Sequence, residues 1–158
     1  MSWELSIKGF KSYLQIERSL SDNSVQAYIR DIKKFANYAI PLKLNELKIQ
    51  RENISDFLAE LKDDGIAARS QARIISGIKA FYKYLIIEDY IKHDRTELIE
   101  SPKVGFKLPD TLSLIEIDKL ISAVDLSNKQ GERNRAILET LYSCGLRVSE
   151  LTYLKLSN

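Results

Sequence analysis

Arg147 is the residue whose surroundings best suit chemistry on a phosphate group. It follows an apolar helical run that ends at Gly145, and Glu150 stands one helical turn after it. A guanidinium is planar, permanently charged and able to donate to two phosphate oxygens at once. The start of a helix also favours an anion. On spacing alone, however, a surface arginine paired with Glu150 is the simpler interpretation.

A second group of candidates lies on a segment with helical periodicity from about residue 70 to residue 88. Arg69 and Arg73 fall on one face of it, away from the apolar stripe, and with Lys79 they could reach phosphates of a nucleic acid. Such contacts set position and affinity rather than sequence preference. Small residues would let this helix approach DNA closely: Ser70, Ser76 and Gly77. The alternative is an ordinary solvated helix face.

Three polar residues near the start of an earlier helical segment could also contact phosphate. They are Asn23, Ser24 and Tyr28. The alternative interpretation is almost as good, because serine and asparagine are common helix N-caps and a tyrosine at this spacing can pack in the core.

Other reactive side chains offer no further chemistry. A single cysteine, Cys144, excludes an internal disulfide and a cysteine-rich metal site. The only histidine, His93, is about fifty residues away, so no Cys–His pair is expected. We therefore expect Cys144 to be a buried structural thiol, His93 to be solvated and no metal site to exist. None of the eight tyrosines is assigned as a nucleophile.

Bulk composition describes an ordinary globular protein. Of the 158 residues 44% are hydrophobic and 29% are charged, and the net charge is only +2. Residues 1–98 carry 16 basic and 14 acidic side chains, whereas residues 99–158 carry 8 of each. Any face that binds a polyanion must therefore come from local clustering. No apolar run approaches the roughly 20 residues that span a membrane, and no signal peptide is seen, so we expect a cytoplasmic protein.

Helical periodicity predicts an all-α chain, because no alternating run is long enough for a strand. Ser113 and Glu116 match a capping box, and Gly145 is placed to end a helix in the left-handed conformation. Apolar residues at helical spacing mark segments within 3–14, 25–36, 54–61 and 117–124, and further helical segments are expected at about 70–88, 133–143 and 148–155.

These segments predict four helices, a linker and then three helices. Periodicity fails from His93 to Asp110, where Pro102, Gly105 and Pro109 occur. We therefore expect domains at residues 1–92 and 111–158, joined by a linker at 93–110. The last 48 residues are too few for a comfortable independent core.

Several stretches resemble the Xer-like tyrosine recombinases of the phage integrase family. The region around Arg147, from Arg133 to Leu151, is similar to the first arginine motif of that family. Two earlier stretches resemble the second and fourth helices of its N-terminal domain: Leu20–Asp31 and Ala68–Leu85. Pro102 and Pro109 stand in sequences that resemble the family's linker. The resemblance thus extends over nearly the whole chain.

This resemblance implies a four-helix, SAM-like core-binding domain that clasps double-stranded DNA, followed by the first helices of a truncated catalytic domain. Arg147 would hold the scissile phosphate, and Glu150 would orient it. In the family a tyrosine attacks the phosphate to form a 3′-phosphotyrosyl bond, without metal or nucleotide cofactor. That tyrosine would lie beyond Asn158, so this chain alone is expected to bind DNA without cleaving it. Family members act as tetramers on paired sites, whereas this chain is expected to be monomeric or weakly associated.

Two other classes of protein remain open. One is a complete, non-enzymatic helical DNA-binding module that reads DNA with the segment at 70–88. The other is a helical interaction scaffold with no nucleic-acid partner, which the near-neutral charge keeps open.

Overall fold

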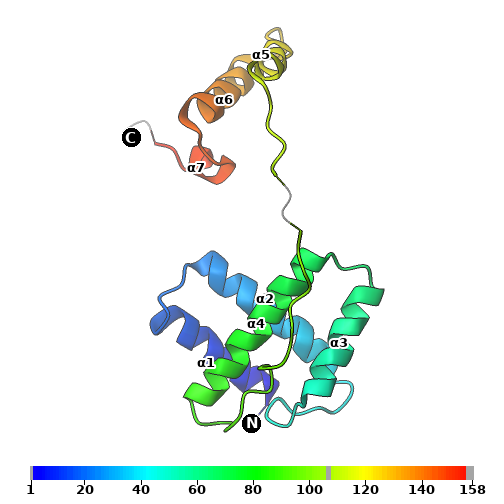
Figure 1. Cartoon of the computed structure of the whole chain (residues 1–158). Helices are drawn as coiled ribbons and strands as arrows, with labels where there is room; N and C mark the ends of the chain where they lie inside the picture. Colours follow the sequence, from blue (N-terminus) through cyan, green and yellow to red (C-terminus); the bar gives the residue numbers. More distant parts are fainter. Residues whose placement is uncertain (1, 106–107, 156–158) are drawn as a thin grey trace. The chain divides into compact units, whose positions relative to one another are not determined.

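The computed structural model describes residues 2–105 and 108–155. Within them it contains only helices and turns, so the all-α prediction is confirmed (Figure 1). No helix among these residues is long and apolar enough to cross a membrane. The helices are α1 (Trp3–Ile16), α2 (Asp22–Ala39), α3 (Arg51–Asp63), α4 (Ala68–Ile87), α5 (Leu114–Ser122), α6 (Gly131–Cys144) and α7 (Val148–Thr152).

The chain divides into two compact units, Met1–Phe106 and Lys107–Asn158. In the first unit α4 packs against each of the other three helices, and α1 also packs against α2. Its core is rich in aromatic rings. The ring of Phe10 meets Phe81 at 5.4 Å between centroids, and Trp3 meets Phe35 at 5.6 Å. The apolar stripes of α1–α4 therefore form one continuous core.

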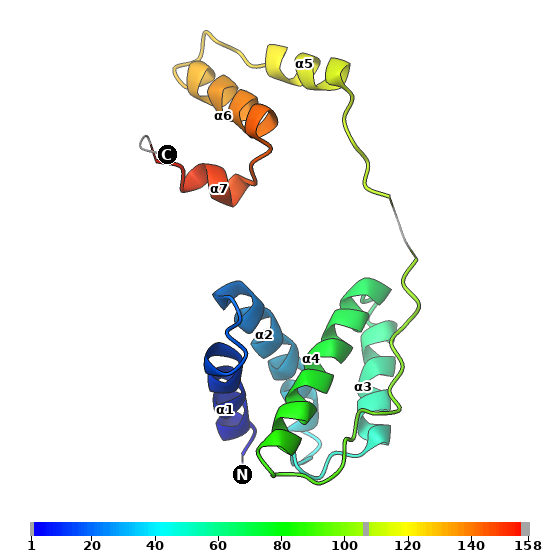
Figure 2. The same ribbon diagram turned by 60° about the vertical axis from the view of Figure 1, so that its left-hand side comes forward.

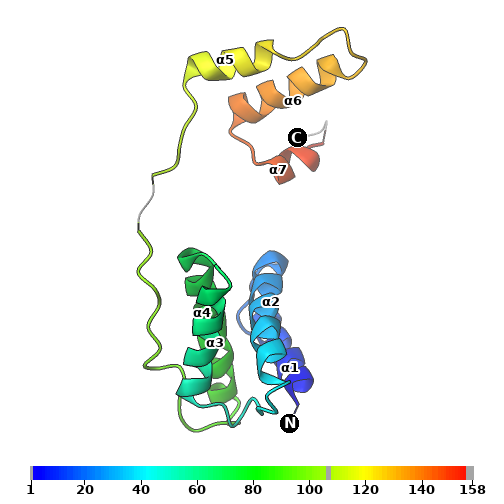
Figure 3. The same cartoon turned by 90° about the vertical axis from the view of Figure 1, so that its right-hand side faces the viewer.

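Figures 2 and 3 show which helix ends lie together in the first unit. α2 and α4 begin at the same end of the bundle, where α1 and α3 finish. Ser21 starts α2 as its N-cap and accepts a hydrogen bond from the Ser24 backbone amide at 3.4 Å. The turns 17–21 and 64–67 thus lie at this end, together with the first turns of α2 and α4.

The chain after α4 continues to pack on the first unit. Ile91 and Ile99 join the core, and Thr96 is buried with its hydroxyl donating to Asp94 Oδ1 at 2.6 Å. The first part of the expected linker, as far as Ile99, therefore lies against the four-helix unit. Beyond it the described residues are largely exposed, from Glu100 onward.

The second unit buries very little. Of its described residues only Gly131 is buried, and α5, α6 and α7 keep apolar side chains in solvent. Gly145 ends α6 with a left-handed φ of 61°, as predicted. The expectation that Cys144 is a buried thiol was wrong, because Cys144 is exposed. Its apolar neighbours in sequence do not form a core around it.

Candidate nucleic-acid interface

Charge is strongly segregated among the helices of the first unit. α4 carries four basic side chains and no acidic one: Arg69, Arg73, Lys79 and Lys83. α3 has the opposite balance, with two basic and four acidic residues. Arg69, Arg73 and Lys83 are exposed, and Lys79 is half-buried. The net charge of +2 thus conceals one cationic helix and one acidic helix.

α2 adds to the cationic side. It carries Arg30, Lys33 and Lys34, and its only acidic residues are Asp22 in the first turn and Asp31. The Asp31 side chain is only 4% exposed, because it points toward α4. Beyond its first turn, α2 therefore shows solvent basic side chains without an acidic one among them.

Arg73 and Asp31 form an ion pair between α4 and α2. Arg73 Nη1 donates to Asp31 Oδ1 at 2.6 Å and to Oδ2 at 2.5 Å, while 51% of the arginine side chain stays exposed. Burial raises the pKa of Asp31 above its ordinary value, and the hydrogen bond and charge of Arg73 act against that rise. Arg73 is therefore hydrogen-bonded through Nη1, while about half of its side chain remains accessible to solvent.

Gly77 is the point where α4 comes closest to Asp31. It is buried, and a Cβ added there would lie 2.9 Å from the Asp31 Cβ. The expectation that Gly77 helps the helix approach DNA was wrong, because the glycine faces α2 and makes room for the Asp31 side chain.

The remaining candidates on α4 lie where the sequence predicted, outside the core. Ser70 is half-buried near the helix start, next to exposed Arg69. Ser76 is exposed, and its hydroxyl donates to the Ala72 carbonyl at 3.0 Å. A serine bonded in this way keeps its oxygen available as an acceptor, but its proton is already used.

At the start of α2 the structure gives two of the three polar candidates, Ser24 and Tyr28, a local role as well. The Ser24 hydroxyl is 3.0 Å from that of Ser21, while Asn23 is exposed. The Tyr28 ring is half-buried and meets Phe10 edge-to-face, with centroids 6.4 Å apart. Asn23 and Ser24 lie at the same end of the bundle as Arg69 and Ser70, because α2 and α4 begin together (Figures 2 and 3).

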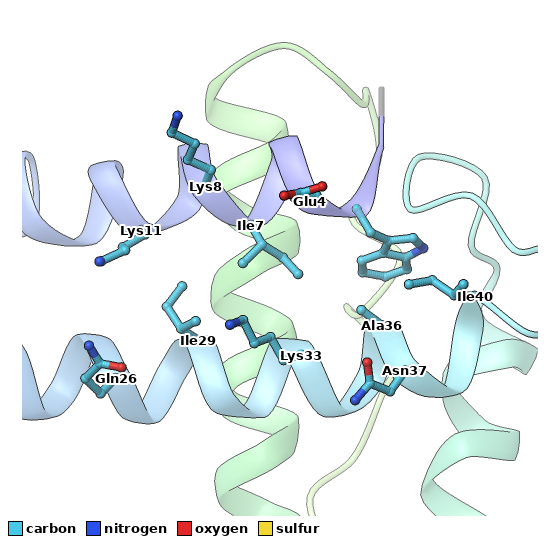
Figure 4. A pocket seen from close by; sticks show the side chains of 11 residues that line it. Glu4, Ile7, Lys8, Lys11, Gln26, Ile29, Lys33, Ala36, Asn37 and Ile40 are labelled. Carbon is cyan, nitrogen blue, oxygen red and sulfur yellow. The ribbon is translucent and has the colours of Figure 1, made fainter.

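A groove of about 600 Å³ is lined mainly by residues of α1 and α2. Ile7 and Ile29 point toward one another in it, and Lys8, Lys11 and Lys33 are among the polar side chains that line it (Figure 4). These lysines were not predicted as site residues from the sequence, and neither were Arg30 and Lys34. The signal was present, since basic residues recur at three- and four-residue spacing on segments that also carry the apolar stripe.

In the second unit Arg147 is the N-cap of α7 and pairs with Glu150. The Arg147 backbone amide donates to Glu150 Oε2 at 2.7 Å, and Nη1 lies 3.2 Å from Oε1. The backbone hydrogen bond, assisted by the side chain of Arg147, lowers the pKa of Glu150. The arginine side chain is 83% exposed, so it can reach a ligand while Glu150 restrains it.

The chain is similar to known proteins over nearly its whole length. The family described as "Phage integrase, N-terminal SAM-like domain" matches residues 7–89. Tyrosine recombinase XerD from Staphylococcus aureus strain Mu50 is 41% identical over 156 residues, which cover 98% of this chain and 53% of the relative. XerD from Staphylococcus haemolyticus is 40% identical over the same share. The chain thus spans about half the length of the curated relatives it matches.

One solved structure, the integrase from mycobacterium phage Brujita, shares the fold. It superposes with a TM-score of 0.58 at 21% identity, over 92% of this chain and 47% of the other. Fold and sequence thus agree with the four-helix, SAM-like arrangement of α1–α4, and they do not favour an unrelated scaffold. This chain belongs to the phage integrase family and is a Xer-like tyrosine recombinase sequence.

Proposed function

We propose that this chain binds duplex DNA through the adjoining surfaces of α2 and α4. We call this surface the α2–α4 face and define it by Arg30, Lys34, Arg69 and Arg73. The observation that carries the proposal is the segregation of charge, since α4 has no acidic residue and the only acid within α2 beyond its first turn is buried. A cationic face without interleaved acids is what binding to a phosphate backbone requires.

Polar side chains around this face would add phosphate contacts without reading sequence. They are Asn23, Ser24, Tyr28, Ser70, Ser76 and Lys79. Hydroxyl and amide groups commonly serve in this way beside the cations. As phosphate contacts they would fix the position of the protein on the duplex without carrying sequence information. Ser76 would donate to phosphate only by turning its hydroxyl away from the Ala72 carbonyl.

We further propose that the chain is part of a site-specific tyrosine recombinase that acts in the cytoplasm. It would supply the DNA-binding surface and the arginine that binds the scissile phosphate. Arg147 would donate to the non-bridging oxygens of the scissile phosphate, and Glu150 would orient it. In the whole recombinase a tyrosine oxygen bonds to that phosphorus, and the 5′-oxygen leaves as a hydroxyl. The whole enzyme would work as a tetramer on paired DNA sites, and this chain alone would be monomeric.

Binding to a duplex of about 30 base pairs, measured by fluorescence anisotropy across a salt series, tests the DNA-binding proposal. We expect the apparent affinity to fall steeply with salt. Arg30→Ala/Arg69→Ala should lower the slope of log affinity against log salt by about 2, one for each lost phosphate contact. Neither arginine has an ion-pair partner among the described residues, so the change leaves no buried charge behind.

The matched control is Arg51→Ala/Lys62→Ala on α3, which removes the same charge from exposed positions. We expect it to leave the slope nearly unchanged. An equal loss in both variants would mean that only bulk charge matters, and an absence of binding at low salt would exclude the α2–α4 face as a DNA-binding surface.

A further inference from the structure

We propose that Asp31 is a positioning residue, which holds the Arg73 guanidinium in the orientation that receives a DNA phosphate. This proposal rests on the proposed DNA-binding function. It assigns a role to a buried acidic residue on the cationic surface, where a carboxylate would otherwise only weaken binding to a polyanion.

The geometry of the pair leaves most of the guanidinium available. Both hydrogen bonds to Asp31 come from Nη1 of Arg73. Among the described residues the guanidinium makes no other hydrogen bond, so Nη2 and Nε remain for an outside acceptor. Two neighbouring guanidinium nitrogens can match two oxygens of a phosphate. With 51% of the side chain exposed, an acceptor can reach them from solvent.

The carboxylate is itself fixed in place. Asp31 is only 3% exposed, and its Cβ packs where Gly77 leaves space on α4. A cation on each side in sequence also acts on it electrostatically, Arg30 and Lys34, and neither bonds to it. Asp31 is therefore a rigid acceptor between two helices. A guanidinium that is hydrogen-bonded to it is restricted in its motion as well.

Rigidity matters because an arginine side chain has several rotatable bonds. A free arginine must lose that freedom when it binds a phosphate, which reduces affinity. An arginine already held by Asp31 has lost much of it during folding. Two expectations follow: the pair should increase DNA affinity, and it should do so through Arg73 alone.

The sign of the effect separates positioning from simple electrostatics. Asp31→Asn removes a negative charge from the binding surface, so electrostatics alone predicts tighter binding to DNA. Positioning predicts weaker binding, by roughly 3- to 10-fold, because Asn holds a guanidinium less firmly. Asp22→Asn is the matched control, since it makes the same change in the first turn of the same helix. It should leave affinity unchanged or raise it.

The measurements use the same duplex and salt series, with thermal unfolding recorded for each variant. Asp31→Asn should weaken binding in the wild-type background and have no weakening effect in an Arg73→Ala background. In NMR relaxation, Nε–H of Arg73 should be ordered in the wild type and mobile in Asp31→Asn without DNA. Loss of packing alone would not couple affinity to Arg73 in this way.

Arg73→Lys keeps the charge and serves if Asp31→Asn does not fold. Lysine is a flexible point donor without the planar fork, so Arg73→Lys should bind DNA roughly 3- to 10-fold more weakly than the wild type. Tighter binding by Asp31→Asn, unchanged binding by Arg73→Lys, or a mobile Nε–H of Arg73 in the wild type would each overturn the positioning role. If the wild type itself binds no DNA, the proposed function fails instead.

Discussion

The Asp31–Arg73 pair shows how one contact shapes the surface around it. Arg73 pairs with the buried carboxylate, so the charged side chains that α2 exposes beyond its first turn are all basic. A buried carboxylate with a single bonded partner costs free energy to desolvate, and the pair is therefore weak evidence for stability. It is better explained as part of the cationic surface than as a support of the fold.

Gly77 should be essential to that contact. Replacing a helical glycine with alanine normally stabilises a helix by about 1 kcal/mol. Here the new Cβ would approach the Asp31 Cβ to 2.9 Å, and overpacking of this kind costs about 1–3 kcal/mol. We expect Gly77→Ala to lower the free energy of unfolding in urea by about 1 kcal/mol after both effects.

The neighbouring Ser76→Ala is the control, because Ser76 is exposed and only bonds back to its own helix. It should be neutral or stabilise by up to about 0.5 kcal/mol. If Gly77→Ala stabilises the protein as much as propensity predicts, α2 and α4 are not in close contact at Asp31.

At the scale of elements, the sequence was informative wherever local chemistry decides. The Ser113–Glu116 capping box, the left-handed Gly145 and the four amphipathic helices were all predicted correctly. The pairing of Arg73 with Asp31 was not, because the two residues are 42 positions apart and only the packing of α2 on α4 joins them. The site residues themselves remain predictions until binding is measured.

The capping box at α5 predicts a pH dependence of that helix. Its backbone and side-chain hydrogen bonds from Ser113 lower the pKa of Glu116 below the reference value of 4.5. A carboxyl with a lowered folded-state pKa adds stability above its unfolded-state pKa and loses it as pH falls through the folded value. The start of α5 should therefore fray in acid, below pH 4.5.

Carbon-13 NMR titration of the Glu116 carboxyl checks this expectation. Ser113→Ala should move the pKa of Glu116 part of the way back toward 4.5, since the backbone amide of residue 113 still donates to it. Ser122→Ala at the far end of α5 should leave it unchanged. An identical titration in Ser113→Ala would show that the hydroxyl contributes nothing to the cap.

At the scale of the whole chain, the two units differ in what holds them together. The first buries large side chains from all four helices, among them Phe10, Ile32, Phe57 and Ile78. The second exposes large apolar side chains in each of its three helices, including Ile115, Ile137 and Val148. The sequence predicted helices in both units with equal success, because periodicity reports the apolar stripe and not whether anything covers it.

Native-state hydrogen exchange should reveal this difference. Helices shorter than about 12–15 residues are marginal in water without tertiary packing, and α5 and α7 have 9 and 5 residues. We expect interior amides of α2 and α4 to exchange only through global unfolding. Amides of α5–α7 should be less protected by a factor on the order of 100 or more, because they open locally without exposing a core.

Measurement at two protein concentrations supplies the control for association. If the chain is monomeric, protection in α5–α7 should stay low at both concentrations. Protection that rises with concentration would show that a second copy covers these apolar side chains. Protection equal to that of α4 at every concentration would contradict the expectation outright, since it requires a core that the described residues of this unit do not form. The apolar stripes of α5–α7 would then be buried within the single chain.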